Sequence, residues 1–169
     1  AQFWKHKNHL FLLKVFNKIV KKKPNIKLIL SGSKVDHRFP EYHKKIQNFI
    51  KNKQLQKNIL IKDNLSFKKT KILKKKCTAF IVPSLYEGWN LVVEEARSLN
   101  KIVLLSNIPS HIEQNYSKSI FFALNDEKDL YKKIINFNIN KKFSKHNRDS
   151  YETLKKEAIK LIISAYENK

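Results

Sequence analysis

The sequence predicts an α/β fold in which a parallel β-sheet is covered by helices on both faces. Short apolar segments alternate with longer segments whose apolar residues recur every three or four positions, and this alternation repeats at least five times along the chain. The short segments are almost continuously apolar, as strands buried on both faces are. The 169 residues fit one domain, and no repeat or low-complexity linker divides them.

The longer segments have the pattern of amphipathic helices. In the first, residues 9–22, apolar side chains repeat at three- and four-residue steps until Pro24 breaks the pattern. Ser66 is expected to cap a basic helix, and Ser110 with Glu113 fits a capping box at the start of another. The other helices are expected at residues 40–53, 91–99 and 126–138, with a carboxyl-terminal helix at 149–169.

The short apolar segments predict five strands. They are bounded by proline, glycine, asparagine or serine, which are typical of turns. The strands are expected at residues 26–30, 58–62, 79–82, 102–105 and 120–122.

Charge is the most unusual feature of the composition. The chain carries a formal net charge of +22, and residues 1–76 hold 22 basic residues against three acidic ones. Only three of the 36 basic residues are arginines, although base readout and bidentate phosphate contacts favour arginine, so the composition argues against a nucleic-acid partner. Two interpretations stay open: compositional drift on solvated faces, or contact with a lipid surface or another polyanion.

The composition also argues against several classes of protein. Cys77 is the single cysteine, so neither an internal disulfide nor a cysteine zinc cluster can form within the chain. No apolar run approaches the ~18 residues of a membrane span. The six histidines show no metal-ligand spacing, which favours surface or capping roles for them. The simplest interpretation is a cytoplasmic protein, with peripheral contact at the inner membrane face if the anionic partner is lipid.

The loop after the strand at 79–82 contains the largest group of candidate functional residues. In open α/β sheets, ligands bind beyond the carboxyl ends of the strands. Gly88 permits a close backbone approach to a ligand, and Asn90 can cap the following helix, whose first N–H groups favour a phosphate. Glu87 lies in the turn and Glu95 inside the helix, and the hydroxyl groups of a sugar or ribose are suitable partners for both carboxylates.

The string EGWNLVVEEA, which follows AFIVPS, resembles the E-x7-E signature of retaining glycosyltransferases with the GT-B fold, notably family 4, or group 1. The opening string QFWKHKNH is similar to the G-R-L-x-x-x-K-G start of that family's donor-binding domain. The resemblance covers residues 1 to about 138. The sequence departs from the family pattern at Gln2, Asn90 and Val92, where the family has arginine, glycine and proline.

The resemblance implies a role for each matching residue. Glu87, the candidate catalytic residue, would hydrogen-bond the donor sugar, Glu95 would bond the ribose, and Lys7 would neutralise the diphosphate. The resemblance implies donor contacts for Gly32 behind the nucleotide, Leu65 near the base, and Gly88, Trp89, Asn90 and Leu91 around the diphosphate or sugar.

The resemblance also implies what the whole protein does. Residues 1–169 would form one nucleotide-sugar-binding domain with a Rossmann-like sheet, and an acceptor-binding domain would precede residue 1. The expected activity is hexosyl transfer, with retention, from a nucleotide-sugar to a glycan or lipid-linked acceptor in polysaccharide or glycolipid assembly, without a metal. This chain alone would bind donor weakly without turnover. Two other functions stay open: a sugar-nucleotide epimerase relative, and a basic module that binds a polyanion or a membrane surface.

Overall fold

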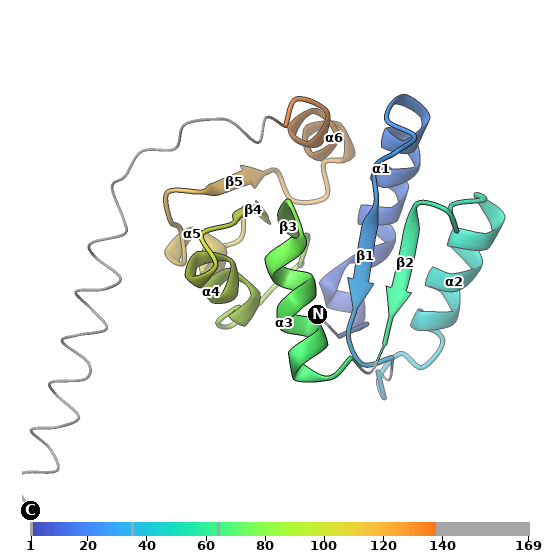
Figure 1. Ribbon diagram of the computed structural model, residues 1–169, viewed down its shortest axis with the longest axis horizontal. Helices are drawn as coiled ribbons and strands as arrows, with labels where there is room; N and C mark the ends of the chain where they lie inside the picture. Colours follow the sequence, from blue (N-terminus) through green and yellow to red (C-terminus); the bar gives the residue numbers. More distant parts are fainter. Residues whose placement is uncertain (1, 35, 64, 138–169) are drawn as a thin grey trace, which may run out of the picture. The chain divides into compact units, whose positions relative to one another are not determined.

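The computed structural model describes residues 2–34, 36–63 and 65–137 (Figure 1). These residues lie within one compact unit. The predicted helix at 149–169 lies outside the described residues.

The helices follow the predicted periodicity closely. The first helix has the predicted bounds, and the structure adds a short 3-10 turn, η1, ahead of it. Ser66 caps α3 as predicted, because its Oγ accepts a hydrogen bond from the Lys69 amide. The helical elements are η1 (Lys5–Lys7), α1 (His9–Lys22), α2 (Tyr42–Asn52), α3 (Phe67–Lys76), α4 (Leu91–Ser98), α5 (Pro109–Glu113) and α6 (Glu127–Ile135).

The predicted strands form parallel ladders, which confirms the α/β class. The strands are β1 (Leu28–Ser31), β2 (Ile59–Lys62), β3 (Ala79–Val82), β4 (Ile102–Ser106) and β5 (Ser119–Phe122). Within the described residues, β1 pairs with β2, while β3, β4 and β5 form a second sheet in that order. The register aligns Leu28 with Ile59, Ala79 with Ile102, and Val103 with Ser119. The sequence suggested one continuous sheet, and the structure instead separates β1 from β3.

Helices cover the strands on both faces. Helix α1 packs against α6 and α2, and α4 packs against β3 and β4. In Figure 1, α3 lies in front of the interval between the two sheets and α1 lies behind β1. Strand β4 is buried along its whole length, and its Val103 and Leu105 pack with Val82, Val93 and Ala96 in one core cluster. Burial on both faces explains why β4 is continuously apolar in the sequence.

The amino-terminal segment crosses the carboxyl ends of β1 and β3. The Phe3 amide donates to the Ser33 carbonyl oxygen at 3.0 Å, just beyond β1. The Leu85 amide, just beyond β3, donates to the His6 carbonyl oxygen at 2.8 Å. Both strands therefore end at the same edge, and η1 is fixed above it.

The predicted capping box at Ser110 is wrong. Helix α5 begins one residue earlier, at Pro109, and Ile108 occupies the N-cap position. Proline suits the first helical position because its fixed φ is already helical and its missing N–H has no role there. Ser110 therefore lies inside the helix, where its side chain cannot cap it.

His9, at the start of α1, is buried in this core. Its ring stacks on Phe3 with a centroid separation of 5.0 Å, and 6% of the residue is exposed. Burial, together with nearby positive charge that includes Lys7, lowers the pKa of His9 from 6.5 to about 3. The folded protein therefore keeps His9 neutral at a pH where the unfolded chain protonates it.

We expect replacement of His9 by phenylalanine to reduce the acid sensitivity of the fold. In the wild type the unfolded state binds the extra proton, so stability falls as pH drops below 6.5, by about 2 kcal/mol at pH 5 from this group alone. Urea unfolding at pH 8 and pH 5 measures this loss in both proteins. An equal loss in His9→Phe and the wild type would contradict the assignment.

Candidate functional site

Lys7 reaches the site from η1, which ends in a sharp reversal at Asn8. Asn8 has φ 56° and ψ 37°, a left-handed conformation that asparagine tolerates better than most side chains. Its Nδ2 donates to Asn125 Oδ1 at 3.0 Å, which ties this corner to the loop before α6. The reversal separates η1 from α1 and holds Lys7 above the carboxyl edge of the strands.

Lys7 and Glu87 form the central contact of the site. Lys7 Nζ lies 2.6 Å from Glu87 Oε1 and 2.8 Å from Oε2, so the ammonium bonds both carboxylate oxygens. The side chains are 16% and 8% exposed, respectively. The buried Glu87 carboxylate needs a cationic partner such as Lys7, because an unpaired buried charge is strongly unfavourable.

Asn90 connects Glu87 to helix α4. Its Nδ2 donates to Glu87 Oε1 at 3.0 Å, and its Oδ1 accepts from the Val92 amide at 2.9 Å. Asn90 is therefore the predicted N-cap of α4, and it also holds the Glu87 carboxylate beside the start of that helix.

Gln114 and His111 hold Asn90 in place, and neither was predicted as part of the site. Gln114 Oε1 accepts from the Asn90 amide at 2.8 Å, and its Nε2 donates to the Asn90 carbonyl at 3.2 Å. His111 Nδ1 lies 2.9 Å from the Ser106 carbonyl oxygen, and Nε2 lies 3.4 Å from Asn90 Nδ2. Because the amide can only donate, Nε2 accepts and Nδ1 carries the proton.

Both supporting residues are fully buried, which corrects the surface or capping role expected for His111. Burial lowers the pKa of His111, so the ring stays neutral. The available signal was the three-residue spacing of Ile108, His111 and Gln114, which puts all three on one helical face.

Glu95 lies apart from this cluster. Its Oε1 bonds Lys74 Nζ of α3 at 2.6 Å, and its side chain is 42% exposed. Among the described residues, the ion-pair partner of Glu95 is therefore a lysine. Trp89 and Leu91 are also exposed, at 55% and 72%.

The turn before α4 presents free backbone groups. A Cβ added to Gly88 would meet nothing within 4 Å, so the space above this residue is open. The amides of Asn90, Val92 and Val93 are engaged with Gln114 Oε1, Asn90 Oδ1 and the Asn90 carbonyl, respectively. Within the described part of the chain, no hydrogen-bond partner is found for the amides of Gly88, Trp89 and Leu91.

A cavity of about 890 Å³ opens at this edge and continues between β1 and β3. Four of the predicted donor-binding residues line it: Lys7, Gly32, Leu65 and Asn90. Gly32 has φ 155°, which L-residues rarely adopt. The predicted site residues that do not line the cavity are Glu87, Gly88, Trp89, Leu91 and Glu95.

The site therefore combines two kinds of recognition. Lys7 and Lys74 supply positive charge, and the start of α4 supplies amides and the positive end of a helix dipole, which suits an anion. Glu87 and Glu95 supply acceptors for hydroxyl groups. Residues 2–34, 36–63 and 65–137 contain no cluster of three metal-ligating side chains. Their helices are also too short or too polar to cross a membrane.

Comparisons with known proteins identify the family. The sequence profile described as glycosyl transferases group 1 matches residues 1–161. Curated protein sequences give no match. Solved structures of glycosyltransferases share the fold, which confirms the GT-B resemblance.

Three solved structures illustrate the likeness. A glycosyltransferase from Rickettsia africae has a TM-score of 0.69 at 23% identity, covering 80% of this chain and 35% of its own. HepE of Anabaena, in complex with UDP-glucose, has a TM-score of 0.70 at 17% identity, covering 80% and 36%. A variant of S. aureus TarM with fondaparinux, alpha-GlcNAc-glycerol and UDP has a TM-score of 0.67 at 22% identity, covering 80% and 26%. The chain spans about a third or less of the length of these proteins, and at these identities the likeness concerns the fold. By the match over residues 1–161, the chain belongs to the glycosyl transferases group 1 family.

Proposed function

We propose that this chain binds the nucleotide-sugar donor of a retaining glycosyltransferase. The observation that carries the proposal is the cluster of Lys7, Glu87 and Asn90 at the start of α4, beside three amides without partners. The cluster brings a cation from η1 together with a carboxylate and N–H donors from the turn before α4. A sugar linked to a diphosphate needs all three, because it carries both negative charge and hydroxyl groups.

Lys7 can serve Glu87 and a phosphate at the same time. Its ammonium has three N–H donors, and the two contacts to Glu87 leave one for a phosphate oxygen. The amides of Gly88, Trp89 and Leu91 and the helix dipole add to the stabilisation of the diphosphate. During transfer, the bond from the anomeric carbon to the diphosphate breaks and a bond to an acceptor hydroxyl forms, so negative charge grows on the leaving phosphate. We propose that these groups stabilise that charge without a metal.

The two carboxylates have different roles in this proposal. Glu87 is buried and oriented by Lys7 and Asn90, so we assign it the sugar hydroxyl groups. Glu95 is more exposed and lies just over one turn inside α4. We therefore assign it the ribose, whose hydroxyl groups would replace Lys74 or bind beside it. HepE, whose structure contains UDP-glucose, supports a uridine nucleotide as the first donor to test.

We propose a hexosyl donor and an acceptor that is a glycan or a lipid-linked glycan, with the reaction in the cytoplasm and in polysaccharide or glycolipid assembly. The TarM structure, which contains alpha-GlcNAc-glycerol, supports the acceptor class by analogy. Because the chain spans about a third or less of such proteins, the acceptor site and turnover are assigned to the longer protein.

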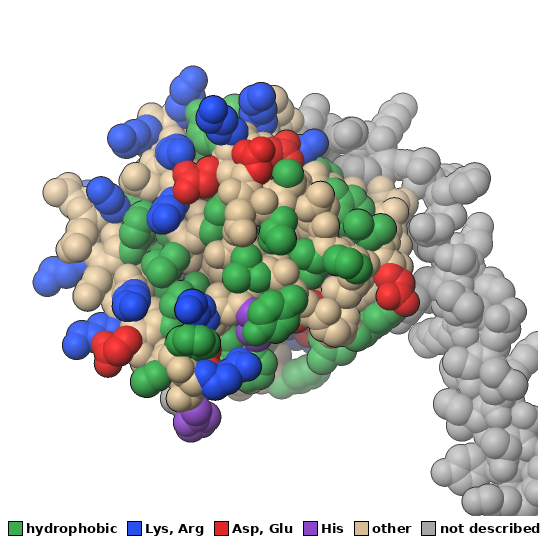
Figure 2. Space-filling model, turned by 180° about the vertical axis from the view of Figure 1, so that it is seen from behind, with side chains coloured by type: hydrophobic (Ala, Val, Ile, Leu, Met, Phe, Trp, Pro, Cys, Tyr) green, Lys and Arg blue, Asp and Glu red, His purple; other side chains and the backbone are tan. Residues whose placement is uncertain are grey.

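A second candidate function, contact with an anionic membrane surface, is favoured by helix α3. Phe67 is 84% exposed and Ile72 is 46% exposed. Basic side chains surround them on the same short helix: Lys68, Lys69, Lys71, Lys74, Lys75 and Lys76. Exposed apolar side chains within a basic helix are typical of interfacial binding. Figure 2, which views the opposite face, shows lysine and arginine side chains spread over the left side and top rather than gathered in one groove.

We expect the two carboxylates to separate sugar binding from nucleotide binding. Glu95→Gln should weaken UDP and UDP-glucose alike, by about tenfold, because both carry the ribose. Glu87→Gln should weaken UDP-glucose relative to UDP, because only the former carries the sugar. Calorimetric titration of both ligands gives the affinity ratio.

The matched control for this experiment is Glu127→Gln. Glu127 also pairs with a lysine, Lys18, at 2.7 Å, but it lies on α6 away from the site. Its substitution should leave both affinities unchanged. If Glu87→Gln and Glu127→Gln behave alike, the assignment of Glu87 to the sugar is wrong.

We expect Gly88→Ala to reduce donor binding without reducing stability. The new methyl group would meet no protein atom within 4 Å, so the melting temperature should stay within about a degree or two of the wild type. The methyl group would, however, occupy the space through which a diphosphate approaches the backbone. Thermal melting with and without UDP checks both statements, and undiminished stabilisation by UDP would contradict this approach path.

Metal removal is expected to have little effect on donor binding. Lys7 and the amides at the start of α4 provide the positive charge that a metal would otherwise supply to the diphosphate. UDP affinity should therefore be equal in EDTA and in Mg²⁺. A requirement for Mg²⁺ would contradict this assignment of charge.

We expect Phe67→Ser to weaken binding to vesicles that contain phosphatidylserine. When the protein is bound, the Phe67 ring would insert into the membrane interface, so its loss should lower the partition coefficient about tenfold. Neutral vesicles should bind neither protein. Vesicle cosedimentation measures this. Exposed Phe39 on the loop before α2 provides the control Phe39→Ser, and equal effects of both substitutions would argue against α3 as the contact.

A further inference from the structure

Three loops at the carboxyl edge of the strands share a row of stacked side chains, which we call the aromatic row. It consists of Tyr86, His6, Trp4 and Arg38, in that order. The ring centroids of Tyr86 and His6 lie 4.7 Å apart, with 21° between their planes, and those of His6 and Trp4 lie 5.5 Å apart. Arg38 Cζ lies 5.6 Å from the Trp4 centroid. These separations are typical of favourable aromatic and cation–π contacts.

Backbone hydrogen bonds hold the three loops of the aromatic row together. Asp36 is 3% exposed, and its carboxylate accepts from the Lys5 amide at 3.2 Å and from the Arg38 amide at 3.1 Å. The His6 carbonyl oxygen accepts from the Leu85 amide at 2.8 Å. The aromatic row is therefore preformed, so a ligand would not have to order these loops when it binds.

The two ends of the aromatic row are open to solvent. Tyr86 is 59% exposed, and so is the side chain of Arg38, while Trp4 and His6 between them are half-buried. Burial and the positive charge of Lys7 lower the pKa of His6 from its ordinary value of 6.5, so the ring is uncharged at pH 7. Exposed apolar side chains that adjoin one another, unlike single ones, mark interaction sites.

Arg38 gives the aromatic row a planar, charged end. Its Nε lies 3.5 Å from Asp36 Oδ1, and within the described part of the chain its two terminal nitrogens have no hydrogen-bond partner. Those nitrogens form a fork that fits the two oxygens of a carboxylate. Arginine is rare in this chain, with three residues against 33 lysines. A lysine at position 38 would supply the charge, but neither the fork nor the planar stack on Trp4.

The acidic side chains beside the aromatic row are already neutralised. Asp36 is 3% exposed and the Glu87 side chain is 8% exposed, and each is paired with a basic side chain. Lys5, by contrast, is exposed, and so is Arg38. The positive charge of this surface therefore faces solvent while its nearest negative charges do not, which favours an anionic ligand.

A saccharide that carries carboxylates fits this combination of rings and charge. The C–H groups of a sugar form an apolar face that can pack on aromatic rings, while its hydroxyl groups bond to water or polar side chains. A carboxylate on the sugar would accept from both terminal nitrogens of Arg38. Tyr86 directly precedes Glu87, so the other end of the aromatic row adjoins the carboxylate that we assign to the donor sugar.

We propose that the aromatic row binds an acidic glycan, with a carboxylate on Arg38 and sugar rings against Trp4 and Tyr86. The inference rests on the proposed function, because it names the charge of the acceptor glycan and the surface on which it lies beside the donor. A single-stranded nucleic acid also combines rings with negative charge. It would need cations along its whole length to neutralise its phosphates, whereas the aromatic row itself contains one, Arg38.

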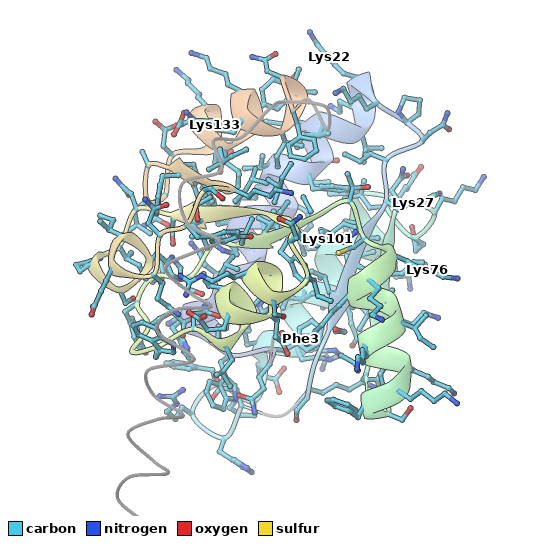
Figure 3. All side chains as sticks on the ribbon, turned by 60° about the vertical axis from the view of Figure 1, so that its left-hand side comes forward. Phe3, Lys22, Lys27, Lys76, Lys101 and Lys133 are labelled. Atoms are coloured by element: carbon cyan, nitrogen blue, oxygen red, sulfur yellow. The ribbon has the colours of Figure 1, made fainter. Side chains whose placement is uncertain are left out.

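A lysine at the far end of the molecule provides the control for charge alone. Lys22 is exposed and ends α1, whereas the aromatic row adjoins the beginning of that helix. A helix of this length separates the two by about 20 Å. In Figure 3, Lys22 lies at the top of the molecule and Phe3, which directly precedes Trp4, lies well below it.

The test titrates the ¹⁵N-labelled full chain with trigalacturonate and with its methyl ester. The two probes have the same sugar rings, and only the first is charged. Trigalacturonate should produce saturable shifts of the Trp4 indole N–H and of the His6 and Tyr86 amides. Its affinity should exceed that of the ester about tenfold, because a carboxylate bonded to arginine is a charge-assisted pair. Equal affinity for the two probes, or no saturable shift in the aromatic row, overturns the proposal.

Substitutions then separate the fork from charge in general. Arg38→Lys keeps the charge and should weaken trigalacturonate about tenfold, whereas Lys22→Ala removes a charge and should leave the affinity unchanged. Tyr86→Leu should weaken the acid and the ester alike, because it removes a ring and no charge. Equal effects of Arg38→Lys and Lys22→Ala would mean non-specific attraction and overturn the proposal. If Arg38→Lys does not fold, the comparison of acid and ester in the wild type decides.

Two further titrations of the same samples identify which statement fails. Saturable binding of UDP-glucose without binding of trigalacturonate overturns this inference and leaves the donor proposal intact. Binding of trigalacturonate at the aromatic row without binding of UDP-glucose supports the acidic-glycan site and contradicts the donor proposal. A thymidine oligonucleotide that binds the aromatic row more tightly than trigalacturonate would identify a nucleic-acid surface and overturn the glycan assignment.

Discussion

The site depends on the contact between Lys7 and Glu87, which lie 80 positions apart in the sequence. The contact joins the turn ahead of α1 to the loop after β3, so it links the two sheets at their carboxyl edge. Both side chains are mostly buried, and neither would be stable there as a lone charge. Removing either partner would leave the other unpaired, so the same contact that organises the site also constrains the fold.

The rest of the site supports this contact through hydrogen bonds that fix the orientation of the Asn90 and Glu87 side chains. Asn90 bonds Glu87 and caps α4, Gln114 bonds both the amide and the carbonyl of Asn90, and His111 accepts from the Asn90 side chain. These supporting groups are fully buried and neutral, which lets them orient the carboxylate without competing for Lys7. Glu95, in contrast, is itself 42% exposed where it pairs with Lys74, and a ligand could replace that contact at low cost.

Local signals in the sequence predicted the elements well. The bounds of α1 and β3 were predicted to the residue, and Ser66 was recognised as a cap, because periodicity and caps are local properties. The capping box at Ser110 failed because Pro109 competes for the first helical position. The contacts of Lys7 and Gln114 could not be predicted, since they depend on which loops the sheet brings together.

The central claim is that a nucleotide-sugar lies against the start of α4 beside Lys7. The most direct measurement is an NMR titration of the ¹⁵N-labelled chain with UDP-glucose. The account predicts saturable shifts of the Gly88, Trp89 and Leu91 amides, whose backbone groups lack partners within the described residues. Saturable shifts confined to residues away from this turn, such as the lysines of α3, or no saturable shift at all, would contradict it.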